Sequence, residues 1–184
     1  MSGPSEPVAW SSHEVAQELL DAGAVRFGSF TLASGATSDV YIDVKRAWTD
    51  PRRLDGLARA LAVRVRNEER LAGMELGAVP LVVAVALRVR RPFVVLRKAQ
   101  KEHGTRQAFE GEIPEGASVL LLEDVTTTGG STVRSVEIVR AAGGKVDRAV
   151  AVVDREAGAP ERLGAVGVRL ESLVTLTELR ATRR

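Results

Sequence analysis

Residues 119–131 read Val-Leu-Leu-Leu-Glu-Asp-Val-Thr-Thr-Thr-Gly-Gly-Ser, and this segment carries the strongest structural signal in the chain. The four apolar residues at its start are typical of a buried strand in a parallel sheet. Two adjacent carboxylates, Glu123 and Asp124, follow where that strand is expected to end. Apolar residues with the spacing of an amphipathic helix come next. The segment therefore predicts a strand, an acidic pair, a small polar loop and a helix.

The loop between the predicted strand and helix is suited to an anionic ligand. Ligands of open α/β sheets bind at the carboxyl ends of the strands. The threonines at 126–128, Ser131 and the free N–H groups of a helix N-terminus together favour phosphate. The acidic pair repels phosphate but accepts hydrogen bonds from sugar hydroxyls. We therefore predict a ligand that contains a ribose and a 5′-phosphate.

Two common nucleotide-binding motifs and a plain capped turn fit this loop less well. The chain contains neither the G-x-x-x-x-G-K-[ST] pattern of a Walker A loop nor the G-x-G-x-x-G pattern of a dinucleotide site. A plain turn capped by Thr or Ser needs one hydroxyl, whereas this loop places several of them behind two carboxylates. We therefore favour a sugar-phosphate site over a capped turn.

The composition is that of one globular domain. The 184 residues include 45% hydrophobic and 27% charged residues. No apolar run reaches the roughly 18 residues of a membrane span, and residues 1–10 lack a signal pattern, so we expect a cytoplasmic protein. The lack of cysteine excludes disulfides and thiolate metal ligands. The net charge of +2 suits anionic substrates and does not indicate nucleic acid.

Strand and helix patterns alternate along most of the chain. We expect helices at residues 12–20, 51–66, 80–87, 131–142 and 176–180, and strands at 24–33, 38–44, 71–74, 92–96, 119–122, 148–153 and 168–173. This alternation predicts an α/β fold with a parallel sheet, right-handed crossovers and helices on both faces. The early strand pair and the first helix would form a small cap on that core.

The segment at 119–131 resembles the phosphoribosyl pyrophosphate (PRPP) motif of the type I phosphoribosyltransferases. A second polar segment, residues 97–104, reads Arg-Lys-Ala-Gln-Lys-Glu-His-Gly and follows the strand predicted at 92–96. Most charged segments of this kind are solvated surface loops. This one starts at the same sheet edge as the phosphate site, where a closing loop could stabilise charge on a departing pyrophosphate. Gly104 and Gly111 are expected to be its hinges.

Arg-Lys-x-x-Lys-x-His-Gly further resembles the catalytic loop of the orotate phosphoribosyltransferases. Four other stretches resemble the same family in the same order: residues 30–35 with Ser38, Tyr41 and Asp43 as its N-terminal hood, residues 73–80 as its pyrophosphate-side loop, Glu110-Gly111, and Asp154-Arg155-Glu156. The resemblance covers residues 12–180 and implies a type I phosphoribosyltransferase core. It implies one domain over residues 1–184, with the hood at 12–46 packed on a core at 50–180.

The resemblance implies that the chain transfers the phosphoribosyl group of PRPP to orotate, giving orotidine 5′-monophosphate and pyrophosphate in pyrimidine synthesis. It implies Mg²⁺ that is carried by PRPP, without direct protein ligands to the metal. It also implies a homodimer whose mobile loop, residues 98–111, is shared across subunits. We expect no nucleic-acid and no membrane partner.

The resemblance also assigns site residues. Catalytic roles fall to Arg97, Lys101 and His103, with His103 either an acid or only a pyrophosphate contact. Orotate would contact Thr127 and Arg155, since a guanidinium binds a planar carboxylate in a bidentate way. The PRPP-binding residues would be Arg97, Lys98, Lys101, His103, Glu123, Asp124, Val125, Thr126, Thr127, Thr128, Gly129, Gly130 and Ser131.

Two positions depart from the family pattern. Several relatives carry a lysine where this chain has Ala33, and often another where it has Gly77. Lys45 and Arg46 are candidates to replace these cations, although plain surface charge is the stronger interpretation.

Two alternative functions stay open. A purine phosphoribosyltransferase would give no reason for Arg155. A non-catalytic PRPP-sensing regulator usually adds a DNA-binding domain or loses the catalytic loop, whereas Lys101 and His103 are present.

Overall fold

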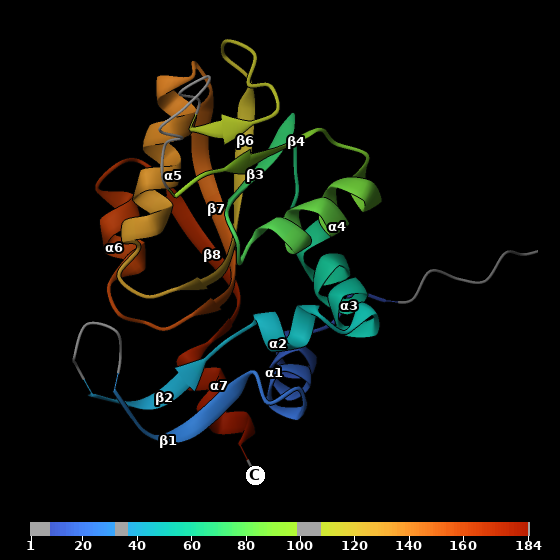
Figure 1. Ribbon diagram of the computed structural model, residues 1–184, viewed down its shortest axis with the longest axis vertical. Helices are drawn as coiled ribbons and strands as arrows, with labels where there is room; N and C mark the ends of the chain where they lie inside the picture. Colours follow the sequence, from blue (N-terminus) through green and yellow to red (C-terminus); the bar gives the residue numbers. More distant parts are fainter. Residues whose placement is uncertain (1–7, 32–36, 99–107, 184) are drawn as a thin grey trace, which may run out of the picture.

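The computed structural model of the protein describes residues 8–31, 37–98 and 108–183. Its main sheet has six strands in the order β5-β4-β3-β6-β7-β8 (Figure 1). Five strands run parallel: β3 (Arg70–Met74), β4 (Phe93–Leu96), β6 (Ser118–Thr126), β7 (Lys145–Asp154) and β8 (Arg169–Thr175). The short β5 (Phe109–Glu110) pairs antiparallel with β4 at one edge. The predicted parallel α/β fold is confirmed.

Helices cover both faces of the sheet, so both faces are buried. Successive side chains of β6 point to opposite sides and therefore enter two different cores. Leu120 and Leu122 belong to the core formed with α1 (Ser12–Asp21), α3 (Pro51–Ala62) and α4 (Val79–Val89). Val119 and Leu121 belong to a second core, formed with α5 (Gly130–Ala141) and α6 (Ala159–Gly164). Figure 1 shows α5 and α6 on one side of the sheet and α3 and α4 on the other.

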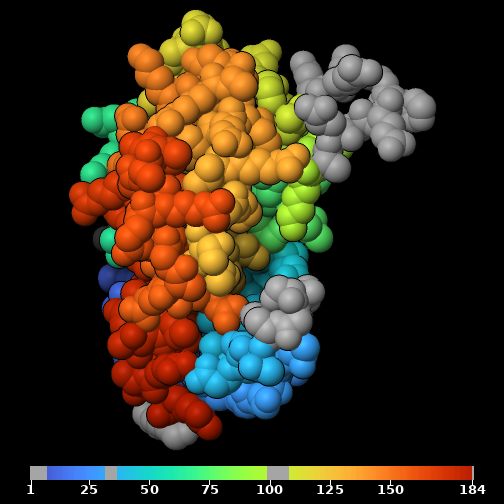
Figure 2. Space-filling model, turned by 90° about the vertical axis from the view of Figure 1, so that its left-hand side faces the viewer, coloured from blue at the N-terminus to red at the C-terminus, as the bar shows by residue number. Residues whose placement is uncertain are grey.

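The hood contains a separate two-stranded antiparallel sheet made by β1 (Val25–Thr31) and β2 (Thr37–Ile42). The short α2 (Lys45–Trp48) leads from the hood to α3. The C-terminal helix α7 (Leu176–Thr182) packs beside α1, and Arg180 of α7 pairs with Asp39 of β2 at 2.7 Å. Figure 2 shows the red α7 surface next to the blue and cyan hood. The hood is therefore built from both ends of the described chain.

The helix predicted at 51–66 starts as expected but ends early, at Ala62. Pro51 occupies the first turn, and the Asp50 carboxylate accepts hydrogen bonds from the N–H groups of Arg52 and Arg53. Beyond Ala62 the N–H of Arg64 donates to the carbonyl of Leu61, three residues back. This tighter turn ends the α-helix and redirects the chain toward β3.

Three further predictions of the elements were wrong or incomplete. The strand predicted at 119–122 runs to Thr126, because parallel pairing with β7 continues to Thr126 opposite Asp154. The acidic pair therefore lies within the strand. Part of the polar segment 98–111 forms β5, whose residues pair with Val95 and Leu96. The short helices α2 and α6 were not predicted.

Among the described residues, no helix combines the length and the apolar character required to cross a membrane.

Candidate active site

A cavity of about 360 Å³ opens at the carboxyl edge of the sheet, where β3, β4 and β6 end. It is lined by Lys45, Met74, Glu75, Leu76, Gly77, Lys98, Glu123, Asp124, Val125 and Ser131. Five of these residues were predicted as PRPP-binding. They come from two predicted segments, 97–104 and 119–131, which the parallel sheet brings to one edge.

The two acidic residues of the motif lie in different surroundings. Glu123 is 4% exposed, and its Oε1 has no hydrogen-bond partner among the described residues. Burial, followed by the charge of Asp124, raises the pKa of Glu123 to about 8, although Thr132 and Lys98 act in the opposite direction. Glu123 is therefore mostly protonated at neutral pH in the ligand-free site. A protonated Glu123 can still meet a sugar hydroxyl, but not as a charged acceptor, so the prediction that both carboxylates act in the charged form does not fit Glu123.

Asp124 lies against Gly77 of the loop between β3 and α4. A Cβ atom at position 77 would come within 2.1 Å of Oδ2 of Asp124. The other carboxylate oxygen, Oδ1, accepts a hydrogen bond of 2.9 Å from the N–H of Val125. Because Gly77 carries no side chain, the Asp124 carboxylate occupies space that the side chain of any other residue at position 77 would overlap.

The hydroxyls of the loop after β6 do not cap the helix that follows. The N-cap of α5 is Gly129, with a φ of 76° and no side-chain capping bond. The side chains of Thr127 and Thr128 are exposed and form no hydrogen bond with any described residue. The capped-turn alternative therefore fails, and the hydroxyls and N–H groups at the N-terminus of α5 stay available to an anion.

The short helix α6 backs this loop. A Cβ at Gly129 would lie 3.2 Å from the Cα of Ala159, so the loop touches the start of α6. A Cβ at Gly130 would lie 3.5 Å from Nη1 of Arg162. Arg162 therefore brings a guanidinium to the phosphate loop. The sequence held no signal for it, since α6 itself was not predicted.

The ends of β6 and β7 are joined by hydrogen bonds. The Thr126 hydroxyl donates to Oδ1 of Asp154 at 3.4 Å, and the N–H of Arg155 donates to the carbonyl of Thr126 at 3.0 Å. The Glu156 carboxylate accepts bonds from the N–H and the hydroxyl of Thr177, at 2.8 and 2.6 Å. These bonds fix Arg155 at the carboxyl edge of the sheet, one strand away from the acidic pair.

Arg155 lies between the core and the hood. Its Nη2 donates to the hydroxyl of Ser38 on β2 at 3.1 Å. Its Nε is buried and has no partner among the described residues. A buried donor without a partner is costly unless a ligand satisfies it, so the guanidinium is poised to bind an acceptor. The side chain of Tyr41, the hood residue named by the resemblance, packs against Phe30 and Arg26.

The first two residues of the basic segment after β4 take different positions relative to the cavity. The backbone N–H of Lys98 donates to Oε1 of Glu75 at 2.9 Å, and the Lys98 side chain lines the cavity. Arg97 pairs with Glu110 across β4 and β5 and does not line the cavity. Lys101 and His103 lie outside the described residues, and so does Ala33.

Sequence reasoning missed or undervalued three residues near the acidic pair. Lys45 lines the cavity, whereas its place in the sequence favours plain surface charge. Glu75 directly follows β3, so the rule that ligands bind at strand ends could have identified it. Thr132 is fully buried on α5 beside Glu123, and only the folded structure reveals that contact.

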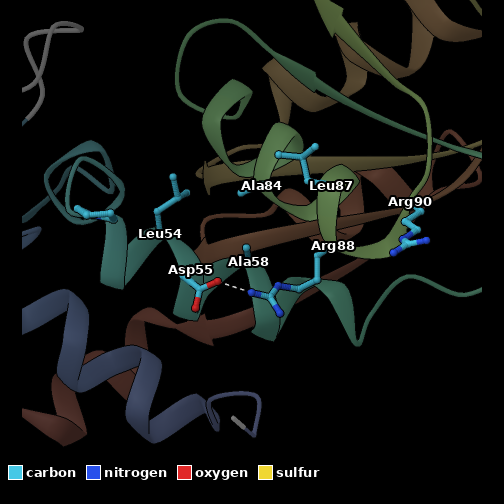
Figure 3. Close-up of a pocket in the computed structure, with 8 residues that line it drawn as sticks. Leu54, Asp55, Ala58, Ala84, Leu87, Arg88 and Arg90 are labelled. Carbon is cyan, nitrogen blue, oxygen red and sulfur yellow. Dashed lines mark hydrogen bonds and ion pairs between the residues drawn. The ribbon is translucent and has the colours of Figure 1, made fainter. Parts of the chain in front are cut away.

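A larger groove of about 500 Å³ lies elsewhere, between α3 and α4 (Figure 3). Leu54, Ala58 and Leu87 give it apolar walls, and its Asp55 already pairs with Arg88. It lies on helix surfaces and contains no phosphate-binding loop. The smaller cavity at the strand ends is therefore the candidate active site.

No described cluster of three or more His, Cys, Asp or Glu side chains could hold a metal ion. The cavity wall offers carboxylate oxygens, chiefly those of Asp124 and Glu75. Mg²⁺ that already carries substrate phosphates and waters would need no direct protein ligand at this wall.

The comparisons with known proteins agree with this geometry. The family model described as "Phosphoribosyl transferase domain" matches residues 48–171. An orotate phosphoribosyltransferase from Methanocaldococcus jannaschii is 44% identical over 166 residues, which cover 90% of this chain and 94% of the relative. The crystal structure of an orotate phosphoribosyltransferase from Aeropyrum pernix is 36% identical with a TM-score of 0.82, covering 91% of this chain and 96% of that one.

An orotate phosphoribosyltransferase from Mycobacterium tuberculosis, solved in complex with PRPP, is 30% identical with a TM-score of 0.74, covering 92% of this chain and 98% of that one. Matches of this extent confirm the resemblance that the five sequence stretches indicated. The chain belongs to the phosphoribosyltransferase family and, within it, to the orotate phosphoribosyltransferases.

Proposed function

We propose that the protein transfers the phosphoribosyl group of PRPP to orotate, giving orotidine 5′-monophosphate and pyrophosphate in pyrimidine synthesis. One observation carries the choice of base: the Arg155 guanidinium, held by Ser38, keeps a buried Nε without a partner among the described residues. Orotate has a planar carboxylate, which a guanidinium binds through two parallel hydrogen bonds. The names of the relatives support the same substrate.

Different parts of the site bind different groups of PRPP. The 5′-phosphate binds the loop from Thr127 to Ser131 at the N-terminus of α5, whereas the hydroxyl of the predicted Thr126 is directed to Asp154. The Asp124 carboxylate accepts hydrogen bonds from the ribose hydroxyls. The pyrophosphate lies in the cavity beside Lys98 and the loop that contains Gly77.

Catalysis in this proposal is positioning and charge stabilisation. The orotate ring nitrogen attacks the anomeric carbon on the face opposite the pyrophosphate, and the carbon–oxygen bond to pyrophosphate breaks. The sugar gains oxocarbenium character, as in other glycosyl transfers. No covalent intermediate with the protein is needed, so the loop and Arg155 act by holding the reactants in line. Bound together with PRPP, Mg²⁺ would supply positive charge to the pyrophosphate.

We also propose that Lys101, His103 and Arg97 stabilise the departing pyrophosphate. Arg97 is directed to Glu110, away from the cavity of its own subunit. A shared arrangement therefore suits it: a homodimer in which the segment 98–111 reaches the neighbouring site. PRPP and orotate are anions that do not cross a bilayer unaided, so we place the protein in the cytoplasm with their source.

A panel of bases tests the assignment. Wild type is mixed with PRPP, Mg²⁺ and orotate, uracil or adenine, and pyrophosphate release is measured. Uracil lacks the carboxylate and would leave Arg155 unpaired, so orotate should be preferred by roughly ten- to a hundredfold. Arg155→Lys should lose much of that preference, because an ammonium cannot form the bidentate pair.

Arg169→Lys is the matched control, since Arg169 is largely exposed at the amino end of β8. It should keep wild-type selectivity. A wild type that prefers adenine would establish the purine alternative. A wild type that binds PRPP but releases no pyrophosphate with any base would establish the sensing alternative.

A further inference from the structure

Lys45 lies where the hood joins the core. It is the first residue of α2, and its side chain lines the cavity together with Gly77, Asp124 and Lys98. Its Nζ lies 2.6 Å from Oδ1 of Asp43, and 47% of the side chain is exposed. The hydrogen bond to Asp43, with smaller contributions from Asp124, raises the pKa of Lys45, although burial opposes this. Lys45 is therefore a permanent cation that faces the cavity.

Lys45 supplies one of the two positive charges on the cavity wall. The wall carries the carboxyl groups of Glu75, Glu123 and Asp124 and the ammonium groups of Lys45 and Lys98. Because the pKa of Glu123 is about 8, two charged carboxylates face two ammonium groups at neutral pH. Removing Lys45 would leave this wall net negative, and a pyrophosphate group would be repelled.

The geometry gives Lys45 free donors. An ammonium group has three N–H donors, and the ion pair with Asp43 at 2.6 Å does not engage all of them. The nearby Ala47 is 1% exposed, so α2 is anchored in the core and holds Lys45 in place. Arg46, the next residue along, is exposed and does not line the cavity.

We infer that Lys45 donates hydrogen bonds to the pyrophosphate oxygens of PRPP, as the hood's own contribution to the phosphate end of the site. This inference rests on the proposed use of PRPP. It gives the hood two contacts with the substrates: Ser38 through Arg155, and Lys45 directly.

The test compares three ligands by calorimetry in the presence of Mg²⁺. Lys45→Gln should bind pyrophosphate and PRPP roughly tenfold more weakly than wild type, the lower end for a charge-assisted bond at a half-exposed site. Ribose 5-phosphate has no pyrophosphate, so its affinity should be unchanged. Arg46→Gln removes one neighbouring positive charge and should bind all three ligands as wild type does.

Removing Lys45 also leaves Asp43 without its ion pair. A structural effect of the lost ion pair must therefore be distinguished from the loss of a pyrophosphate contact. The double variant Asp43→Asn/Lys45→Gln removes both charges and leaves no unpaired carboxylate. If Lys45 served only Asp43, the double variant would bind pyrophosphate with wild-type affinity, and the inference would be overturned. Continued weak binding, with recovery in Lys45→Arg, supports it. If Lys45→Gln failed to fold, the double variant would carry the same comparison.

The outcome is independent of the choice of base, because pyrophosphate binding is measured without one. If Lys45→Gln binds pyrophosphate weakly and the wild-type protein does not use orotate, only the proposed function is refuted. If Lys45→Gln binds pyrophosphate normally and the wild-type protein is active on orotate, only the role of Lys45 is refuted.

Discussion

Glu123 and Asp124 are neighbours in the sequence and take opposite electrostatic characters in the fold. Alternation along β6 turns Glu123 toward α5, where its side chain is buried beside Thr132. Asp124 turns toward the cavity and Gly77. Strand periodicity predicts that the two differ in exposure only once the strand is known to continue to Thr126.

Glu123→Gln should remove a pH dependence of stability. Burial raises the pKa of Glu123 to about 8 in the folded protein, against 4.5 ordinarily. The native state therefore holds this proton more tightly. The resulting stability is complete below about pH 4.5 and is lost as the pH rises through about 8.

Urea unfolding at several pH values measures this effect. Between pH 5 and 8, the free energy of unfolding of wild type relative to Glu123→Gln should fall by up to about 1.4 kcal/mol per pH unit. Other titrating groups cancel in the difference between the two proteins. Parallel pH profiles would show that Glu123 is ionised in the native state.

Residue types alone predicted that the acidic pair and the hydroxyl loop share one ligand, and the family resemblance added Arg155 to that prediction. Sequence reasoning undervalued Lys45, because its place on the cavity wall depends on how the hood docks. It also could not show that Gly77 leaves room for Asp124, since that contact joins residues from different loops.

At the scale of elements, the phosphate loop is shaped by a contact with α6. Gly129 has a φ of 76° and meets the backbone of Ala159. Both conditions favour glycine: the left-handed region is unfavourable for other residues, and a Cβ would crowd α6.

Gly129→Ala should lower stability by about 1–2 kcal/mol and weaken PRPP binding, because the loop must shift away from Ala159. Gly164→Ala is the matched control at the end of α6, where a Cβ would meet nothing within 4 Å. Urea unfolding and PRPP titration measure both variants. Equal behaviour of the two would show that this loop does not require glycine.

The elements that periodicity predicted well are long and apolar, such as α4 and the start of β6. The elements that periodicity missed are short, or they form only because a neighbouring strand pairs with them. The two residues of β5 are a strand only because β4 pairs with them. Helix α6 has six residues and too few apolar positions to show a period. The last residues of β6 are polar and are held in the strand by β7.

At the scale of the whole molecule, alternation of elements predicted the parallel sheet and its two covered faces correctly. The hood was predicted as an N-terminal cap, and the contribution of α7 to it was not. Arg180 reaches Asp39 across 141 residues of sequence, a contact that no local pattern contains.

The proposed homodimer predicts that two inactive variants restore activity when mixed. Lys101→Ala would disable the shared loop and Asp124→Asn the ribose site. If the loop acts on the neighbouring subunit, a mixed dimer contains one site with a wild-type loop and a wild-type Asp124. Equal mixing with subunit exchange should then recover about a quarter of wild-type activity.

The control for this experiment is each variant mixed with itself, which should stay inactive. Size-exclusion chromatography would establish that the mixed sample is dimeric. A sample of mixed dimers without activity would place the loop over its own subunit's site, whereas a monomeric wild type would contradict the dimer itself.

The hood, finally, has a consequence for synthesis of the chain. Its strands leave the ribosome early, but α7, which packs beside α1 and pairs with β2, is made after every strand of the core. Throughout translation the core can fold while the base-side wall lacks its final support. The nascent chain can thus complete the phosphate loop before it completes the hood. A newly made molecule would then acquire its selectivity for the base later than its phosphate loop.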